Sequence, residues 1–129
     1  MMWRFLKVEE IQAIQEKLIE DYGGSHGLRD AGLLDSAVAR ARNKALYEED
    51  VTIGMIAASV SYGLIKNHAF IDGNKRIGLA ALLAFLDANG CTLEVSGDES
   101  EAMVLRAAAS EISEDEWTEC VGRKVRLAR

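Results

Sequence analysis

The sequence predicts a single all-α domain over residues 1–129, a compact bundle of about six helices with at most one short strand or extended segment. Three observations predict this fold class. Proline is absent from the chain, apolar residues recur at helical spacing, and glycines and small polar residues separate the periodic segments. The length suits one domain with a buried core, and no repeat or linker divides it.

Three helices are expected in the first half of the chain. A short extended lead-in over residues 2–6 precedes a helix over residues 8–22, which Gly23-Gly24-Ser25 ends. Asp30 is a good N-cap for a second helix. A third helix is expected from about Val51 to Asn67, and its many small residues favour a central position that other helices approach closely.

The second half begins with a helix from Asn74 to Asn89 that is apolar nearly all round, which indicates a buried helix. Gly90 is a natural residue to end it. Residues 91–95 alternate and favour one short strand. Asp98, with Glu101 three residues later, resembles a capped helix start.

A last helix is predicted from the capping-box pattern Ser113-x-x-Glu116. It follows the helix that is expected to end at Ala109. Cations suit a helix C-terminus, and this helix is expected to end among Arg123, Lys124, Arg126 and Arg129.

Composition limits the classes of function. The net charge of −6 argues against nonspecific DNA binding by the whole surface. Cys91 and Cys120 have no metal-ligand spacing, so both are interpreted as reduced structural residues. No signal peptide and no membrane-spanning apolar run is recognisable. We therefore expect a cytoplasmic protein with no direct contact to nucleic acid or membrane.

The nine residues from His68 to Arg76, His-Ala-Phe-Ile-Asp-Gly-Asn-Lys-Arg, are the most informative of the chain. They precede the predicted buried helix, and the backbone N–H groups at a helix start favour anions. His68 is a candidate base, since an imidazole exchanges protons near neutral pH. Asp72 offers the hard oxygen that Mg²⁺ prefers. This arrangement indicates a site that handles phosphate.

The remaining residues of the motif have different expected roles. Gly73 lets backbone approach a phosphate closely, and the Asn74 side chain can donate to it. Lys75 and Arg76 can neutralise charge on a transferring group. Phe70 is interpreted as a structural anchor that packs into the core, and the neighbouring Ile71 is read in the same way.

This motif resembles the signature loop of the Fic/Doc superfamily, whose general form is HxFx[D/E]GNxR. Lys75 stands where the nucleotidylating Fic branch usually has glycine, which is typical of the Doc (death-on-curing) branch. The resemblance extends to residues 21–30 and 32–37 and to the segment Leu82–Gly90. Ala69 departs from the common pattern, in which a proline precedes the phenylalanine.

The resemblance implies a Fic/Doc fold and a toxin of a toxin–antitoxin pair. It implies a kinase-type transfer of the ATP γ-phosphate, with Mg²⁺, to a threonine hydroxyl of elongation factor Tu, which halts translation. By position, His68 would be the base, Asp72 the Mg²⁺-associated carboxylate, and Asn74, Lys75 and Arg76 the phosphate-binding groups. The alternatives are Fic-type transfer of AMP to a protein hydroxyl and a noncatalytic module that binds an antitoxin.

Regulation is the last expectation from the resemblance. Fic-type proteins are commonly restrained by a helix with the pattern [S/T]xxxE[G/N]. The nearest match, Ser110 to Asp115, fails at its last position. The chain is therefore interpreted as lacking its own inhibitor. A separate Phd-like antitoxin, whose C-terminal segment folds on the toxin, is the implied partner.

Overall fold

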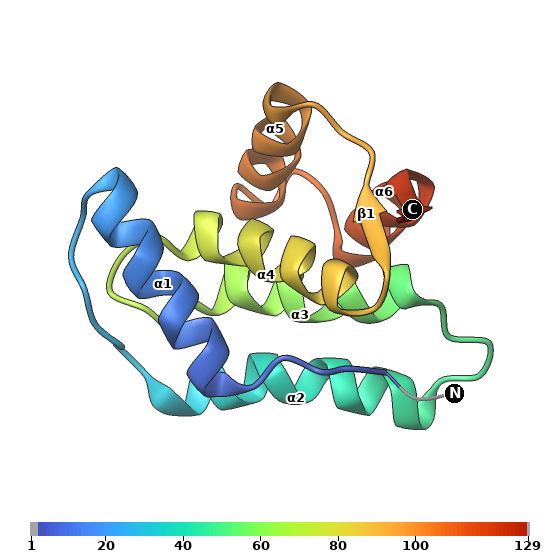
Figure 1. The fold of residues 1–129 in the computed structure, drawn as a ribbon, viewed down its shortest axis with the longest axis horizontal. Coiled ribbons are helices and arrows are strands. Elements are labelled where there is room, and N and C mark those ends of the chain that lie inside the picture. The colour runs from blue at the N-terminus through green and yellow to red at the C-terminus, as the bar shows by residue number, and fades with distance from the viewer. Residues whose placement is uncertain (1–2, 129) are drawn as a thin grey trace.

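The computed structural model describes residues 3–128 as six helices and one two-stranded antiparallel sheet (Figure 1). The predicted all-α bundle with a small extended part is therefore confirmed. In chain order the elements are α1 (Val8–Tyr22), α2 (Ala31–Tyr47), α3 (Ile53–Asn67), α4 (Asn74–Ala88), β1 (Cys91–Leu93), α5 (Gly97–Ala108), α6 (Glu114–Lys124) and β2 (Val125–Leu127).

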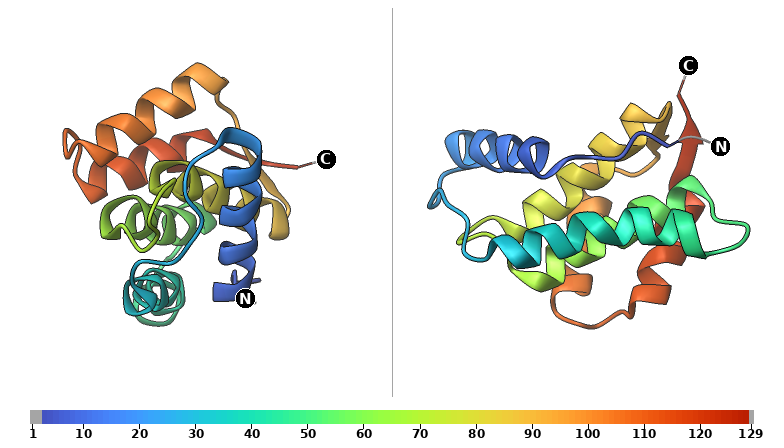
Figure 2. Two further views of the ribbon diagram at one scale, coloured as in Figure 1. Left: turned by 90° about the vertical axis from the view of Figure 1, so that its left-hand side faces the viewer. Right: turned by 90° about the horizontal axis from the view of Figure 1, so that it is seen from below.

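Helix α3 is the centre of the bundle, as its small residues predicted. It packs between α2 and α4, with α6 against it as well (Figures 1 and 2). Gly78 of α4 lies so close to α3 that an added Cβ would collide with the Ile65 side chain. The Ser61 hydroxyl donates a 2.9 Å hydrogen bond to the Gly78 carbonyl. Small residues thus let the two helices that flank the motif pack in near backbone contact.

The first four helices begin close to where the sequence predicted, and α1, α3 and α4 also end close to their predicted ends. The Asp30 carboxylate accepts a 3.0 Å hydrogen bond from the Leu33 N–H and caps α2. Thr52 caps α3, so this helix begins at Ile53 rather than at Val51. Helix α4 ends at Ala88, one residue before its predicted end.

Helix α5 begins earlier than predicted. Its N-cap is Ser96, not Asp98, because Ser96 and Glu99 form a complete capping box. The Glu99 N–H donates to the Ser96 hydroxyl at 3.0 Å, and the Ser96 N–H donates to the Glu99 carboxylate at 3.2 Å. This pairing satisfies two otherwise open backbone donors. Asp98 lies instead in the first turn of the helix, where its charge still suits the dipole.

The C-terminal end of the last helix was predicted wrongly. The capping box of Ser113 and Glu116 starts α6 as expected, but α6 ends at Lys124, and Val125–Leu127 form strand β2. This strand pairs antiparallel with β1 in the register Cys91↔Leu127, Thr92↔Arg126 and Leu93↔Val125.

The pairing replaces the expected helical end with a contact distant in sequence. Arg126 belongs to the strand and lies 3.6 Å from the Glu94 carboxylate. The first strand is also shorter than predicted, since it ends at Leu93 and not at Val95. Arg129 and Met2, which the sequence placed in the last helix and the lead-in, lie outside the described residues.

The core gathers around α3 and α4. Its largest fully buried side chains include Trp117, Phe85, Ile11, Leu34, Ile56, Leu64, Ile65, Ile77, Leu82 and Leu86. Both cysteines are free thiols, Cys91 buried and Cys120 half-buried. Within the described part of the chain, each helix is too short or too polar to cross a bilayer.

Candidate active site

The predicted motif forms the link between α3 and α4, next to the point where the chain leaves α1 (Figure 1). His68 ends α3 in a left-handed conformation, with φ 53° and ψ 49°. Gly73 begins α4, also with positive φ, and provides no side-chain cap. The open N–H groups at the start of α4 are therefore available to a ligand.

The buried middle of the link fixes its shape. Phe70 is 2% exposed and belongs to the core. The Asn74 side chain bonds both backbone groups of Phe70: its oxygen accepts from the Phe70 N–H at 3.0 Å, and its nitrogen donates to the Phe70 carbonyl at 2.9 Å. Asn74 thus holds the loop in shape and keeps one amide N–H for any other acceptor.

Ile71 is not a core anchor, contrary to the interpretation from sequence. It is 57% exposed. Phe70 forms an isolated antiparallel bridge with Leu28, and the Ile71 N–H donates to the Gly27 carbonyl at 3.1 Å. In such extended backbone, successive side chains point to opposite faces. Burial of Phe70 therefore turns Ile71 outward.

Asp72 is an exposed carboxylate held by backbone donors. Its Oδ1 accepts from the Gly73 N–H at 2.9 Å, and its Oδ2 accepts from the Ser25 N–H at 3.2 Å. Gly24 lies so near that an added Cβ would meet Asp72 Oδ2 at 2.6 Å. Gln15 donates to the Asp72 carbonyl at 3.4 Å. The end of α1 and the glycine turn after it therefore determine where this carboxylate lies.

Lys75 and Arg76 occupy the exposed first turn of α4. The Arg76 guanidinium carbon lies 4.7 Å from the ring centroid of Tyr22, the last residue of α1, in a cation–π contact. Within residues 3–128, no carboxylate forms an ion pair with either cation. Both charges thus remain available to an anion, beside the open start of a helix.

The polar residues of the motif line one groove of about 1170 Å³. The groove brings together six of the predicted site residues: His68, Asp72, Gly73, Asn74, Lys75 and Arg76. Phe70 lies in the core, away from the groove. The other part of the groove is mostly apolar and comes from α1, α4 and α5: Leu18, Leu79, Ala80, Leu83, Val104, Leu105 and Ala108.

Sequence reasoning missed several residues that shape this site. Tyr22 stacks on Arg76, the Ser25 N–H binds Asp72, and the Arg29 guanidinium bonds the carbonyls of Asn67 and His68. Tyr22 is the last residue of α1, and Ser25 and Arg29 lie in the segment after it. The sequence marked this segment as part of a family pattern but carried no signal for its partners in the motif.

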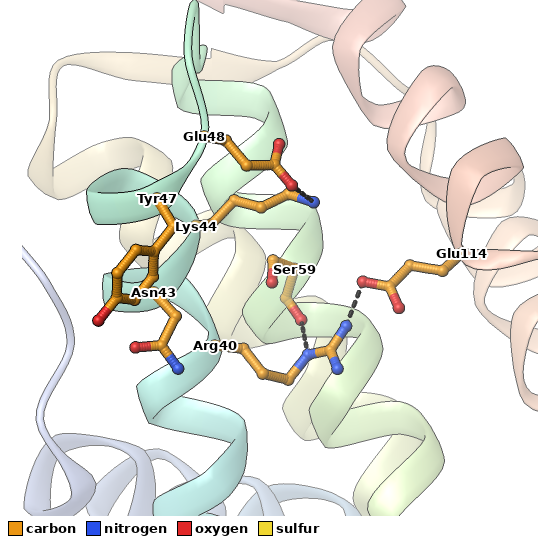
Figure 3. A pocket seen from close by; sticks show the side chains of 7 residues that line it. All are labelled: Arg40, Asn43, Lys44, Tyr47, Glu48, Ser59 and Glu114. Carbon is orange, nitrogen blue, oxygen red and sulfur yellow. Dashed lines mark hydrogen bonds and ion pairs between the residues drawn. The ribbon is translucent and has the colours of Figure 1, made fainter.

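A second, smaller cavity of about 310 Å³ lies among α2, α3 and α6 (Figure 3). Arg40 donates to the Ser59 carbonyl at 2.9 Å and forms an ion pair with Glu114. Lys44 pairs with Glu48 at 2.8 Å. Glu114 is the glutamate of the near match to the inhibitory pattern, and it binds Arg40 rather than the motif arginine Arg76.

Comparison of the sequence with known proteins finds a matching family and related proteins. The model of the Fic/DOC family matches residues 5–93, a span that includes the whole motif and the segment after α1. The protein kinase doc of Escherichia phage P1 is 31% identical over 110 residues, which cover 85% of this chain and 86% of that protein. The toxin Doc of Mycolicibacterium smegmatis is 41% identical over 83 residues, 63% of each protein.

Proposed function

The chain belongs to the Fic/DOC family, in its Doc branch, and on this premise we propose that it is a toxin that transfers the γ-phosphate of ATP to a protein hydroxyl. The observation that carries the proposal is the polar end of the groove. There a histidine, a carboxylate, two cations and the uncapped start of α4 line one wall.

The donor set fits a magnesium nucleotide. Mg²⁺ is usually held by one or two carboxylates, with waters and phosphate oxygens as its other ligands. Asp72 would be the protein ligand, since its carboxylate is exposed and already oriented by two N–H donors. When bound, the ion would neutralise charge on the phosphates. The start of α4 would receive the phosphate oxygens.

The chemistry assigned to the side chains follows from their positions. His68 would accept the proton of the attacking hydroxyl. The hydroxyl oxygen would then bond to the γ-phosphorus, while the bond from that phosphorus to the ADP oxygen breaks and ADP leaves. Lys75 and Arg76 would stabilise the negative charge on the transferring group. Gly73 would keep the backbone accessible to phosphate, and the remaining N–H of Asn74 would donate to it.

Lys75 favours phosphoryl transfer over AMP transfer. A long cationic side chain in the first turn of α4 adds bulk and charge to the anion site. ATP would then bind with its γ-phosphate, rather than its α-phosphate, nearest His68. AMP transfer to a protein hydroxyl remains the second candidate, because every other group of the motif serves either reaction.

The target and the partner follow from the family resemblance. The proposed target is a threonine hydroxyl of elongation factor Tu, whose modification would halt translation. The proposed partner is a Phd-like antitoxin. Its C-terminal segment would dock in the apolar part of the groove, where Leu83 and Leu105 are 42% and 48% exposed. Such a segment would cover the site while it folds.

The test is transfer of label to purified elongation factor Tu from ATP labelled at either the α- or the γ-phosphate, with Mg²⁺. We expect γ-label on the target, lost in His68→Ala. His26→Ala is the matched control, because the chain has only two histidines and His26 is exposed. Transfer of α-label would show AMP transfer instead. Transfer of neither label would favour a noncatalytic antitoxin-binding module or another target.

A further inference from the structure

We propose that Arg29 is a positioning residue for His68, an inference that rests on the function proposed above. Arg29 lies in the link between α1 and α2, far from the motif in sequence. In the structure it fastens the end of α3, and in doing so it determines the direction in which the His68 side chain leaves the backbone.

Three donors of Arg29 meet three consecutive carbonyls. Its backbone N–H donates to the Ala69 carbonyl at 2.8 Å. Its side-chain Nε donates to the His68 carbonyl at 2.7 Å, and Nη2 donates to the Asn67 carbonyl at 3.1 Å. The last carbonyls of a helix lack partners within the helix. A guanidinium is suited to them because its N–H groups form a rigid, planar fork.

His68 needs such support because of its backbone conformation. With φ 53° and ψ 49°, it occupies the left-handed region, which is unfavourable for a residue with a Cβ. Such conformations persist where the surrounding structure fixes them. The direction of the Cα–Cβ bond depends on this backbone geometry. If the turn relaxed toward an ordinary conformation, the imidazole would enter the groove from a different point.

Arg29 is itself held on both sides. The residue before it, Leu28, forms the antiparallel bridge with Phe70. The residue after it, Asp30, donates its N–H to the Ala69 carbonyl at 3.0 Å and caps α2. The Arg29 guanidinium therefore reaches the end of α3 from a backbone position that these contacts fix.

The side chain matters for geometry more than for folding. Arg29 is exposed, so water can replace its hydrogen bonds to the carbonyls when it is removed. The core residues and the bridge at Phe70 do not depend on it. The loss should therefore fall on the placement of His68, and small misplacements of a reacting group lower rates by about 10- to 100-fold.

The test compares Arg29→Met and Arg29→Lys with the wild type. Arg42→Met is the matched control, because Arg42 is another exposed arginine, within α2, and contacts the Phe5 ring rather than the motif. Two readouts are needed: kcat and KM for γ-phosphate transfer, and the NMR signals of the two imidazoles. The second readout does not require transfer activity.

We expect Arg29→Met to lower kcat by about tenfold, with KM for ATP and the melting temperature nearly unchanged, and to shift the His68 ring signals. Arg29→Lys should recover part of kcat, because a lysine supplies one donor in place of the fork. Arg42→Met should change neither readout. If the wild type transfers no phosphate to elongation factor Tu, the proposed reaction on that target is wrong, and the imidazole signals alone decide the role of Arg29.

Two outcomes would overturn the inference. One is an Arg29→Met protein whose kcat and His68 signals match the wild type. The other is a loss of stability and of rate with unchanged His68 signals, since that would make Arg29 a helix cap without influence on the base.

Discussion

Two pairs of cations in this protein have opposite surroundings. Arg40 and Lys44, in the small cavity among α2, α3 and α6, each pair with a glutamate (Figure 3). Lys75 and Arg76, in the groove, form no ion pair with a carboxylate within residues 3–128, and Arg76 lies over an aromatic ring instead. The first pair is neutralised by the protein itself, whereas the second is not.

The difference separates a structural use of charge from a functional one. Arg40 joins three helices through the Ser59 carbonyl and Glu114. Two cations in the first turn of a helix, by contrast, oppose the helix dipole and cost stability. A bound anion would reverse that cost. The groove therefore contains charge that the fold does not need, which is what a phosphate site requires.

The largest expected effect is on catalysis, from Arg76→Ala. Loss of a donor that stabilises transition-state charge typically lowers kcat by about 10²- to 10³-fold. The melting temperature should change little, since the lost contact with Tyr22 offsets the removal of a cation unfavourable to the α4 dipole. Steady-state transfer of γ-label and a thermal melt measure both. A large fall in stability would contradict the assignment of Arg76 to function.

The converse change is Arg40→Met. It removes a charged hydrogen bond to Ser59 and an ion pair that is about one-third exposed, so we expect a loss of about 1–2 kcal/mol in unfolding free energy. Activity of the folded protein should not change. Lys44→Met is the control, with an expected loss below about 0.5 kcal/mol for an i,i+4 pair. Urea unfolding measures both stabilities. A loss of activity without a loss of stability in Arg40→Met would contradict the structural role assigned to Arg40.

Gly24→Ala sharpens the comparison at the carboxylate of the groove. The new Cβ would displace the Asp72 side chain, so we expect about a tenfold higher Mg²⁺ requirement, in line with the cost of misplacing a reacting group. Gly23→Ala is the control, since Gly23 shares the positive φ but has no atom within 4 Å of its added Cβ. Equal effects of the two variants would show backbone strain alone.

Tyr22→Leu should have a smaller effect. An exposed cation–π contact contributes about 0.5–1 kcal/mol, so ATP binding should weaken by about two- to fivefold as Arg76 loses its support. Tyr22→Phe retains the ring and should bind like the wild type. Calorimetric titration with ATP and Mg²⁺ measures this. Tighter binding in Tyr22→Leu would mean that the ring competes with the nucleotide for Arg76.

The smallest effect concerns Glu116, a carboxylate in the first turn of α6 that pairs with none of the four cations. Hydrogen bonding to the Ser113 N–H lowers the pKa of Glu116. A group with a lowered pKa in the folded state stabilises the protein above its ordinary pKa, and this contribution is lost as pH falls through the folded value. Urea midpoints of Glu116→Gln should therefore depend less on acidic pH than those of the wild type. An identical pH dependence would contradict the cap's contribution.

Local signals in the sequence predicted most of the fold. Caps such as Asp30 and Ser113 and helical periodicity located the helices. The sequence contains two overlapping cap patterns near the start of α5, one at Ser96 and one at Asp98. In the structure Ser96 is the N-cap, because it forms a complete capping box with Glu99. The β1–β2 pair was not predictable in the same way, because Val125–Leu127 becomes a strand only through a partner far away in the chain.

The site shows the same division. The spacing of the motif predicted that His68, Asp72, Lys75 and Arg76 share one wall, because a short link and one helical turn bring them there. The contacts of Tyr22, Ser25 and Arg29 to the motif were not predictable from spacing. They depend on how the end of α1 and the segment after it align along the motif, which only the folded bundle determines.

The close approach at Gly78 has a consequence for engineering this protein. His68 follows the end of α3, and Lys75 lies in the first turn of α4. The separation of these two helices therefore also sets the distance across the candidate site. A library that varies core residues for thermal tolerance would sample Gly78, Ser61 and Ile65 as ordinary packing positions. A larger residue at Gly78 would collide with Ile65, so many such variants would lose stability. In a variant that adapted by moving the helices apart, a stability measurement alone would not show that the distance between His68 and Lys75 had changed.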